Sequence, residues 1–386
     1  MKVLLVGGGS GGHITPLLAI ASEIKKRHIN VRISVISEKL SIFNHLFENE
    51  PHVDELFLIN AGKFRRYHGR SLFHHFSDVK SLILNVRDLF KFLIGIMESF
   101  ILLVRIRPDV IFIKGGYVGV PVGLVARLLK IPYITHDSDA KPGLTNRLIG
   151  RRALYNAVGM PPQYYRYRPD KMVFVGVPIG SDFTLKHTEV RKKKRKELDL
   201  NHNDFLLLIT GGSNGAKRMD KMVHAAMKSL LEKNPRLHIV HQVGRENDDI
   251  YLDYPVRLHS RIRVAGFLKP LSSFVAAADA VISRAGATAI SEIGSMAKPL
   301  IIIPNPYLSG GHQLKNAEVL SKDESAIVIN EHLALENNKI LSTAIQKVID
   351  NPAYRHKLGE KLHARIKQNA SLKIAELLVD SARERQ

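Results

Sequence analysis

Two glycine-rich segments carry the residue types best suited to hold a phosphate or hydroxyl group. The first, Gly7–Gly12, leads into His13, and the second, Gly211–Ala216, contains Ser213. A glycine turn between a strand and a helix lets backbone N–H groups approach an anion, and the positive end of the helix dipole favours negative charge there. The sequence therefore predicts two loops that bind phosphates or hydroxyls, although a tight turn alone also explains the glycines of the first.

The first glycine loop is joined to a group that can carry protons. His13 titrates near neutrality and would be exposed at the carboxyl edge of a sheet, where α/β proteins bind ligands. The loop lacks the lysine of a P-loop and fits the dinucleotide fingerprint only loosely, with Glu38 as the nearest acidic residue. We therefore interpret His13 as a candidate general base beside a bound hydroxyl.

Polar residues in the second half of the chain suit a nucleotide and its sugar. Ser283–Thr288 opens a helix after a strand, and Glu292 follows one turn later. A carboxylate there can accept hydrogen bonds from both ribose hydroxyls, or it can simply complement the helix dipole. Near the next strand, His312, Gln313 and Asn316 suit sugar hydroxyls, although isolated residues of these types are more often caps or solvated positions.

The elements that must position these groups alternate between strands and helices. Strands are expected at residues 2–6, 31–36, 110–113, 133–135, 205–210, 237–242, 262–264, 280–282 and 300–303, and the main helices at 16–26, 120–129, 353–383 and from the second glycine loop to about 231. Such alternation is typical of a parallel sheet with helices on both faces. The sequence predicts an α/β protein of two doubly wound, Rossmann-like domains, because the second half repeats the pattern of the first.

Length and spacing place the domain boundary. The 386 residues fit two domains, 1–180 and 181–365, with the change of domain near 180–204. A terminal helix over 366–386 is expected to return to the first domain, a placement that periodicity alone does not establish. The basic run Arg191–Lys196 is interpreted as the solvated start of a helix.

The composition of the chain limits the classes of partner that it is expected to bind. A net charge of +21 and a pI near 10.0 favour polyanions: nucleic acid, anionic lipid headgroups or phosphate-bearing substrates. No nucleic-acid module is recognisable, so we expect no nucleic-acid partner. The absence of cysteine excludes disulfides and thiolate metal sites and fits a reducing cytoplasm. Val3–Val6 is too short for a leader core, and Phe92–Val104 is too short to span a membrane.

A segment between the first strands mixes basic and aromatic side chains. Residues 63–76 include Lys63, Arg65, Arg66 and Arg70 among phenylalanine, tyrosine and leucine residues, and an apolar helix-like run follows over Leu82–Leu103. This mixture favours contact of residues 63–76 with an anionic membrane surface. The apolar run fits a membrane-facing helix and a core helix about equally well.

Taken in order, the motifs of this chain resemble the family-28 glycosyltransferases. The resemblance spans nearly the whole chain, and its carriers are Gly7–Pro16, Gly115–Val118, Gly143–Asn146, Gly211–Ala216, Ser283–Ala287, Ser291–Glu292, His312–Gln313 and Asn316–Ala317. It implies a GT-B fold, in which two Rossmann-like domains face each other across a cleft. The first domain would bind a lipid-linked acceptor at the membrane and the second a UDP-sugar, with no metal or other cofactor.

The resemblance also implies a reaction for a hexosyltransferase of peptidoglycan synthesis. N-acetylglucosamine would pass, with inversion, from UDP-N-acetylglucosamine to the C4 hydroxyl of the N-acetylmuramyl unit of lipid I, undecaprenyl-pyrophosphoryl-MurNAc-pentapeptide, to form lipid II. The enzyme would be peripheral, on the cytoplasmic face of the cell membrane. The implied residues are His13 as catalytic base; Ser10, Gly11, Gly12, Tyr117 and Asp139 for the acceptor; and Gly212, Ser213, Asn214, Gly215, Phe267, Leu268, Arg284, Gly286, Ala287, Glu292, His312, Gln313 and Asn316 for the donor.

Two departures from the family pattern leave alternatives open. His136–Asp139 stands where the family usually has His-Glu-Gln-Asn, and Gly176–Gly180 lacks the arginine of Gly-Asn-Pro-Val-Arg that would face the nucleotide. Lys217, Arg218 or Arg284 could replace that charge. The alternatives are a glycolipid synthase acting on diacylglycerol or another lipid, a UDP-sugar 2-epimerase with the same architecture, and a catalytically weakened homologue that only binds nucleotide sugars.

Overall fold

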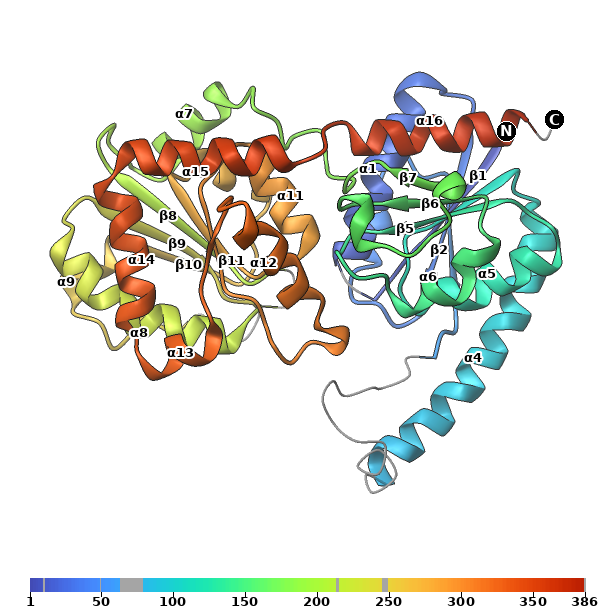
Figure 1. The fold of residues 1–386 in the computed structure, drawn as a ribbon, viewed down its shortest axis with the longest axis horizontal. Coiled ribbons are helices and arrows are strands. Elements are labelled where there is room, and N and C mark those ends of the chain that lie inside the picture. The colour runs from blue at the N-terminus through green and yellow to red at the C-terminus, as the bar shows by residue number, and fades with distance from the viewer. Residues whose placement is uncertain (10, 49, 63–78, 213–214, 245–248, 385–386) are drawn as a thin grey trace. The chain divides into compact units, whose positions relative to one another are not determined.

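The computed structural model describes residues 1–9, 11–48, 50–62, 79–212, 215–244 and 249–384. It divides into two compact units, each built around its own sheet (Figure 1). The first unit comprises Met1–Gly180, Tyr307–His312 and Lys367–Gln386, and the second comprises Ser181–Pro306 and Gln313–Ile366.

The first unit contains a parallel sheet of seven strands. Its elements in chain order are β1 (Lys2–Val6), α1 (Gly11–Arg27), β2 (Arg32–Glu38), α2 (His45–Glu48), β3 (Glu55–Ile59), α4 (Val79–Ile106), β4 (Val110–Ile113), α5 (Gly119–Leu128), β5 (Tyr133–Asp137), α6 (Leu144–Ile149), the 3-10 helix η1 (Gly150–Arg152), β6 (Tyr155–Val158), the 3-10 helices η2 (Pro162–Tyr164) and η3 (Pro169–Lys171), β7 (Met172–Phe174), η4 (Ser309–Gly311) and α16 (Ala370–Arg383). The strand order is β3-β2-β1-β4-β5-β6-β7, and every pairing is parallel.

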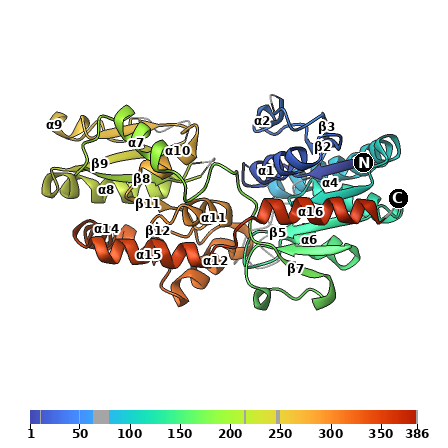
Figure 2. The same cartoon turned by 90° about the horizontal axis from the view of Figure 1, so that it is seen from above.

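Helices cover both faces of this sheet because successive strand residues point to opposite sides. Val3 and Leu5 of β1 pack in the core that includes residues of α1 and α16. Leu4 and Val6 pack on the other face with residues of α4 and α5. The helix α16 comes from the end of the chain and lies along α1, as Figure 2 shows. The C-terminal helix is therefore part of the first unit's core.

The second unit contains a six-stranded parallel sheet. Its elements are α7 (Thr188–Glu197), β8 (Phe205–Thr210), α8 (Lys217–Lys233), β9 (Leu237–Gln242), α9 (Val256–His259), β10 (Ile262–Ala265), α10 (Leu271–Ala277), β11 (Ala280–Ser283), α11 (Ala287–Ser295), β12 (Leu300–Ile302), α12 (His312–Lys322), β13 (Ile327–Val328), α13 (Glu331–Glu336), α14 (Lys339–Asp350) and α15 (Pro352–Arg365). The order is β10-β9-β8-β11-β12-β13. Leu207 and Ile209 of β8 face α8 and α14, whereas Leu206 and Leu208 face α10 and α11.

The order of strands fixes where each unit can hold a ligand. In the first sheet the chain moves outward from β1 to β3 and then returns to place β4 beside β1. In the second sheet the same reversal places β11 beside β8. The loops after two such neighbouring strands leave the sheet in opposite directions and open a crevice at its carboxyl edge. The two glycine loops follow β1 and β8, so each stands at one of these positions.

Several expected elements differ in extent from the structure. The nine expected strands are present, but β3, β6, β7 and β13 are short or weakly patterned and were not expected. The first helix begins at Gly11 rather than Pro16, because the glycine loop itself supplies the first turn and Pro16 is accommodated inside the helix. The expected terminal helix is two helices, since Asn369 adopts the left-handed conformation (φ 60°) between α15 and α16.

The basic run in α7 is not entirely solvated, so that interpretation is wrong for two of its arginines. Arg191 donates to the carbonyl oxygens of Ala276, Ala277 and Ala278 at the end of α10, and to Asp279 at 2.6 Å. Arg195, which is 9% exposed, donates to the other carboxylate oxygen of Asp279 at 3.0 Å. These cations satisfy the last carbonyls of α10 and favour its negative dipole end.

The long helix α4 has one buried face and one exposed apolar face. Leu103 and Ile106 pack in the core, and Glu98 holds Asn60 through the backbone N–H at 2.5 Å and the side-chain amide at 2.9 Å. The exposed apolar side chains are Val86, Leu89, Phe90, Leu93, Ile94, Met97, Phe100, Ile101 and Val104. In Figure 1 the first half of α4 extends beyond the other helices of its unit. Within the described parts of the chain, no helix is both long and apolar enough to span a bilayer.

Candidate active site

The first glycine loop closes tightly around the ends of β1 and β4. Gly9 has φ 87°, and a Cβ there would lie 3.0 Å from the Tyr117 ring, so both the backbone conformation and the space require glycine. The Tyr117 hydroxyl donates to the carboxylate of Glu38 at the end of β2. The loop is thus held between the strand ends on both sides of the crevice, with the first turn of α1 exposed at Gly12.

His13 lies in that first turn with its ring against the Gly115–Gly116 turn. A Cβ added to either glycine would come within 3.9 Å of the imidazole. The Nδ1 atom is buried and has no hydrogen-bond partner among the described residues. Burial and the nearby Lys114 ammonium lower the pKa of His13 to about 4, against the attraction of Asp139. The imidazole is therefore neutral at physiological pH, the form that can accept a proton.

Lys114 places a buried cation beside His13. It follows β4 directly, is 3% exposed, and donates from Nζ to the Ser138 hydroxyl at 2.6 Å. Burial lowers the pKa of Lys114 to about 8, while Asp139 and Asp137 favour the charged form. This cation stands at the edge of the crevice and can attract an anionic substrate.

The departure His136–Asp139 covers the last two residues of β5 and the first two after it, and its side chains are ordered by hydrogen bonds. His136 Nε2 lies 2.8 Å from the Gly176 carbonyl oxygen, and burial lowers its pKa well below the ordinary value. Asp137 accepts from the Gly143 N–H at 2.8 Å and from the Tyr167 hydroxyl at 2.6 Å, while burial raises its pKa. Asn146 donates to the His136 carbonyl oxygen at 2.8 Å. The altered residues are thus integrated into hydrogen bonds of the first unit.

The other residues expected to hold an acceptor are only partly gathered around His13. Ser10 lies outside the described residues, Gly11 is buried in α1, and the Tyr117 hydroxyl is already directed at Glu38. The Asp139 side chain is about one-third exposed, and its negative charge offsets part of the lowering of the His13 pKa. His312, expected on the donor side, groups with the first unit through the short segment Tyr307–His312.

The second glycine loop has room for a ligand at its described residues. Gly212 has φ 79° and no atom within 4 Å of the position of a Cβ, and its carbonyl oxygen accepts from Gln242 at 3.2 Å. Gly215 precedes α8, whose N-terminus points its backbone N–H groups toward the loop. Ser213 and Asn214 lie outside the described residues. The backbone of this loop can therefore cradle a phosphate.

Glu292 is a carboxyl group of the second unit whose pKa is raised. It lies in α11, which begins at Ala287 after the Gly286 cap, and Gly286 has open space where a side chain would stand. Burial and the nearby Asp182 raise the pKa of Glu292 to about 8. A half-buried carboxyl group with a raised pKa is a candidate for binding hydroxyl groups.

Arg284 and Arg218 are engaged with another residue, so they do not stand free to replace the missing arginine. Arg284 is 7% exposed and donates to the Glu331 carboxylate and to the Ile303 carbonyl oxygen. Arg218 Nε lies 2.6 Å from the other carboxylate oxygen of Glu331, and its Nη2 donates to Asn305. The two guanidinium groups brace the loops after β11 and β12 around one buried carboxylate. Lys217 is exposed at the start of α8.

The remaining expected donor residues mainly order the same loops. Asn316 is fully buried and donates to the Ala285 carbonyl oxygen at 3.0 Å, while Gln313 Oε1 accepts from the Asn305 N–H at 2.8 Å. Phe267 is 56% exposed and available to stack on a base, whereas the Leu268 side chain packs in the core and can meet a ligand only through its backbone.

Sequence reasoning missed Lys114, Asp137 and Asn146 as site residues. All three lie in or next to segments that carry motifs, but the sequence analysis assigned roles only to neighbouring residues in those segments. Lys114 could have been found, because it directly follows a buried strand whose carboxyl end lies beside the first glycine loop. The contacts of Asp137 with Tyr167 and Gly143 depend on the fold of later segments, which spacing does not reveal.

Comparison with known proteins decides the family. The glycosyltransferase family 28 N-terminal domain matches residues 3–157, and the family's C-terminal domain matches residues 206–378. The chain belongs to glycosyltransferase family 28. A relative from Caldicellulosiruptor saccharolyticus is 31% identical over 98% of this chain and 97% of its own length. That relative is named UDP-N-acetylglucosamine–N-acetylmuramyl-(pentapeptide) pyrophosphoryl-undecaprenol N-acetylglucosamine transferase.

Solved structures confirm the fold expected for a family-28 enzyme. A MurG from Acinetobacter baumannii superposes with a TM-score of 0.69 and 21% identity, covering 98% of this chain and 99% of the other. A UDP-GlcNAc 2-epimerase from Neisseria meningitidis, bound to UDP-GlcNAc, gives a TM-score of 0.68 at 14% identity, covering 98% and 100%. The family-28 chain is a glycosyltransferase with the GT-B fold, and its likeness to the epimerase is one of fold.

Proposed function

We propose that this glycosyltransferase transfers N-acetylglucosamine from UDP-N-acetylglucosamine to the C4 hydroxyl of the N-acetylmuramyl unit of lipid I, forming lipid II. The observation that carries the proposal is a neutral His13, with an unpartnered buried Nδ1 atom, at the crevice of a chain related over its full length to a transferase of that name. A hydroxyl acceptor needs a base, and a nucleotide leaving group needs an anion site.

In the proposed step His13 takes the proton of the acceptor hydroxyl as the oxygen attacks the anomeric carbon. UDP leaves from the opposite face, so the configuration inverts. A pKa of about 4 makes the free imidazole a weak base. A diphosphate-linked acceptor beside Lys114 and His13 would add negative charge and raise that pKa toward neutrality, which makes the base stronger only when the acceptor is bound.

The second unit would hold the donor. The backbone N–H groups of the Gly212–Gly215 loop and the N-terminus of α8 would stabilise the charge that develops on the leaving diphosphate. Glu292 would accept hydrogen bonds from the ribose hydroxyls, and the exposed Phe267 ring would stack on uracil. Ser213 and Asn214 of the same loop, together with Gln313, remain proposed donor contacts.

We further propose that α4 seats the enzyme on the cytoplasmic face of an anionic membrane. The exposed apolar side chains recur every three or four residues from Val86 to Val104, so they form one stripe about 27 Å long. Lys91 lies within this span and Arg105 follows it, and the expected basic-aromatic segment 63–76 precedes it outside the described residues. A stripe of this kind buries in the interfacial region of a bilayer.

The acceptor assignment is tested by offering purified enzyme and radiolabelled UDP-N-acetylglucosamine either lipid I or diacylglycerol in matched detergent micelles. We expect label to enter lipid I alone, with one hexosamine added per acceptor. Label in diacylglycerol would support the glycolipid-synthase alternative, and formation of UDP-N-acetylmannosamine without an acceptor would support epimerase chemistry.

The membrane assignment is tested by sedimentation with phosphatidylglycerol vesicles at low salt. We expect Phe90→Glu/Met97→Glu to lose most vesicle binding while retaining UDP-N-acetylglucosamine binding. The control Leu333→Glu/Leu335→Glu, which changes two exposed leucines of α13, should sediment like the unmodified protein. Equal sedimentation of both variants would refute the role of α4, and equal binding of the unmodified protein to phosphatidylcholine vesicles would refute the preference for an anionic surface.

A further inference from the structure

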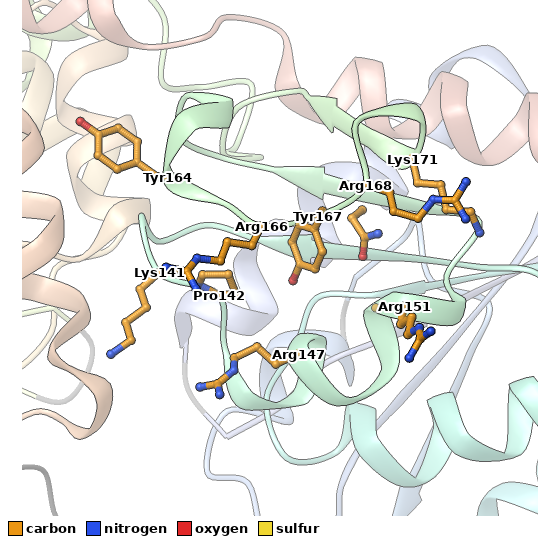
Figure 3. Close-up of a pocket in the computed structure, with 11 residues that line it drawn as sticks. Lys141, Pro142, Arg147, Arg151, Tyr164, Arg166, Tyr167, Arg168 and Lys171 are labelled. Atoms are coloured by element: carbon orange, nitrogen blue, oxygen red, sulfur yellow. The ribbon is translucent and has the colours of Figure 1, made fainter.

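The first unit contains a second cavity that the proposed reaction does not use. It has a volume of about 610 Å³ and is lined by residues between Lys141 and Lys171. These residues follow β5 and flank β6 and β7, whereas His13 follows β1 on the other side of β4. The volume falls in the range of sites that hold small molecules. Figure 3 shows that the cationic side chains of the lining come from several segments, with Lys141, Arg147 and Arg166 toward one side of the view and Arg151, Arg168 and Lys171 toward the other.

The lining of this cavity is strongly cationic. It includes Lys141, Arg147, Arg151, Arg166, Arg168 and Lys171, and none of its lining residues is an aspartate or glutamate. Arg168 is paired with Asp170 at 2.7 Å, and Lys171 donates to the Ala153 carbonyl oxygen. Against the rest of the described chain, Arg147, Arg151 and Arg166 form no hydrogen bond or ion pair. All three side chains are exposed, and cations without partners along one cavity favour the binding of an anion there.

The floor of the cavity carries an unused hydrogen-bond donor. Asn156 of β6 is 2% exposed and lines the cavity, and its Oδ1 atom accepts from the Thr135 hydroxyl at 2.8 Å. Its side-chain N–H₂ group has no hydrogen-bond partner among the described residues. The nitrogen of this amide is not closed off from the cavity, so it can donate to a ligand atom that enters the cavity.

The floor is also shaped to keep that amide in place. A Cβ at Gly150 would lie 2.7 Å from Asn156 Oδ1 and 3.1 Å from the Tyr167 ring, so a larger residue would push both away. Tyr167 is fixed on its other side, because its hydroxyl donates to Asp137 at 2.6 Å. Glycine, asparagine and tyrosine thus form a packed floor beneath the arginines.

We propose that this cavity is a binding site for a phosphate-bearing ligand. Phosphate oxygens would accept from the guanidinium groups of Arg147, Arg151 and Arg166 and from the Asn156 amide. Guanidinium groups match phosphate in geometry and charge, and a buried neutral donor adds direction to the contact. A soluble phosphorylated compound and the headgroup of an anionic lipid share this chemistry. The site is independent of the proposed transfer reaction, because no residue of the glycine loops lines it.

The test is calorimetric titration of the full chain with inorganic pyrophosphate at fixed ionic strength. Arg147→Gln/Arg166→Gln removes two cavity cations, and Arg127→Gln/Arg152→Gln removes two exposed arginines that do not line the cavity. The control leaves the net charge equal to that of the test variant. We expect the test variant to bind pyrophosphate at least tenfold more weakly, and the control to stay within twofold of the unmodified protein.

Competition with two short-chain lipids distinguishes a soluble phosphate compound from the headgroup of an anionic lipid. Dihexanoyl-phosphatidylglycerol below its critical micelle concentration should displace pyrophosphate if the site takes a lipid headgroup, with dihexanoyl-phosphatidylcholine inactive. Failure of the lipid to displace pyrophosphate assigns the site to a soluble phosphate compound. Equal pyrophosphate affinities in the test and control variants overturn the proposal. Because pyrophosphate bound at either glycine loop would affect both variants alike, this result is independent of transferase activity.

Discussion

Binding of UDP-N-acetylglucosamine should release a proton from Glu292. Burial and Asp182 raise the pKa of Glu292 to about 8, so the carboxyl group is about nine-tenths protonated in the free enzyme at pH 7. Ribose hydroxyls that donate to the carboxylate would favour its charged form and lower the pKa in the complex. If the complex titrates below about pH 6, roughly 0.9 proton is released for each donor bound at pH 7.

The affinity of the enzyme for UDP-N-acetylglucosamine should also depend on pH. Since donor binding favours the ionised carboxylate, affinity should fall as pH drops through about 8, by roughly tenfold for each pH unit below it until the pKa of the complex is reached. Titration calorimetry in buffers of different ionisation enthalpy measures the proton number directly, and the sugar nucleotide has no phosphate group that titrates near neutrality. Glu292→Gln should release no proton and bind with little dependence on pH. Proton release that survives this substitution would refute the assignment of Glu292 to the ribose.

Three further changes test other parts of the account. His13→Ala should lower turnover by roughly 10²–10⁴-fold with unchanged donor affinity, because general-base catalysis contributes about that much, and unchanged turnover would exclude His13 as the base. Lys114→Met should move the acidic limb of the kcat/KM profile to higher pH, since loss of a neighbouring cation raises the pKa of His13; an unmoved limb would show that the two groups are not coupled. Asp279→Ala should cost about 3–5 kcal/mol of unfolding free energy, read from urea denaturation, because it leaves Arg195 without its carboxylate; a loss below about 1 kcal/mol would show that this pair adds little.

Much of the fold could be predicted because both sheets are buried on both faces. Strands such as Phe205–Thr210 are continuous apolar runs, and glycine loops mark the turns that follow. The missed strands β7 and β13 have three and two residues, which is too short for periodicity to register. The start of α1 was misplaced because proline is favoured at a first helical position, although here the helix begins at Gly11 and continues through Pro16.

Only those site residues that follow a predicted strand or glycine loop could be predicted from the sequence. His13 and Glu292 follow glycine loops, and their types indicate proton transfer and hydroxyl binding. The role of Arg284 could not be read, because its partner Glu331 is distant in sequence and meets it only through the fold. The basic cavity was missed for the same reason: Arg147 lies in α6, Arg151 in η1 and Arg166 in a later loop, and only the fold brings these segments to one cavity.

The central claim is tested most directly by UDP release from purified enzyme given a panel of UDP-sugars with and without lipid I. The account predicts release with UDP-N-acetylglucosamine only when lipid I is present, and formation of lipid II in equal amount. Release that needs no lipid I, or an equal rate with another UDP-sugar, would contradict it.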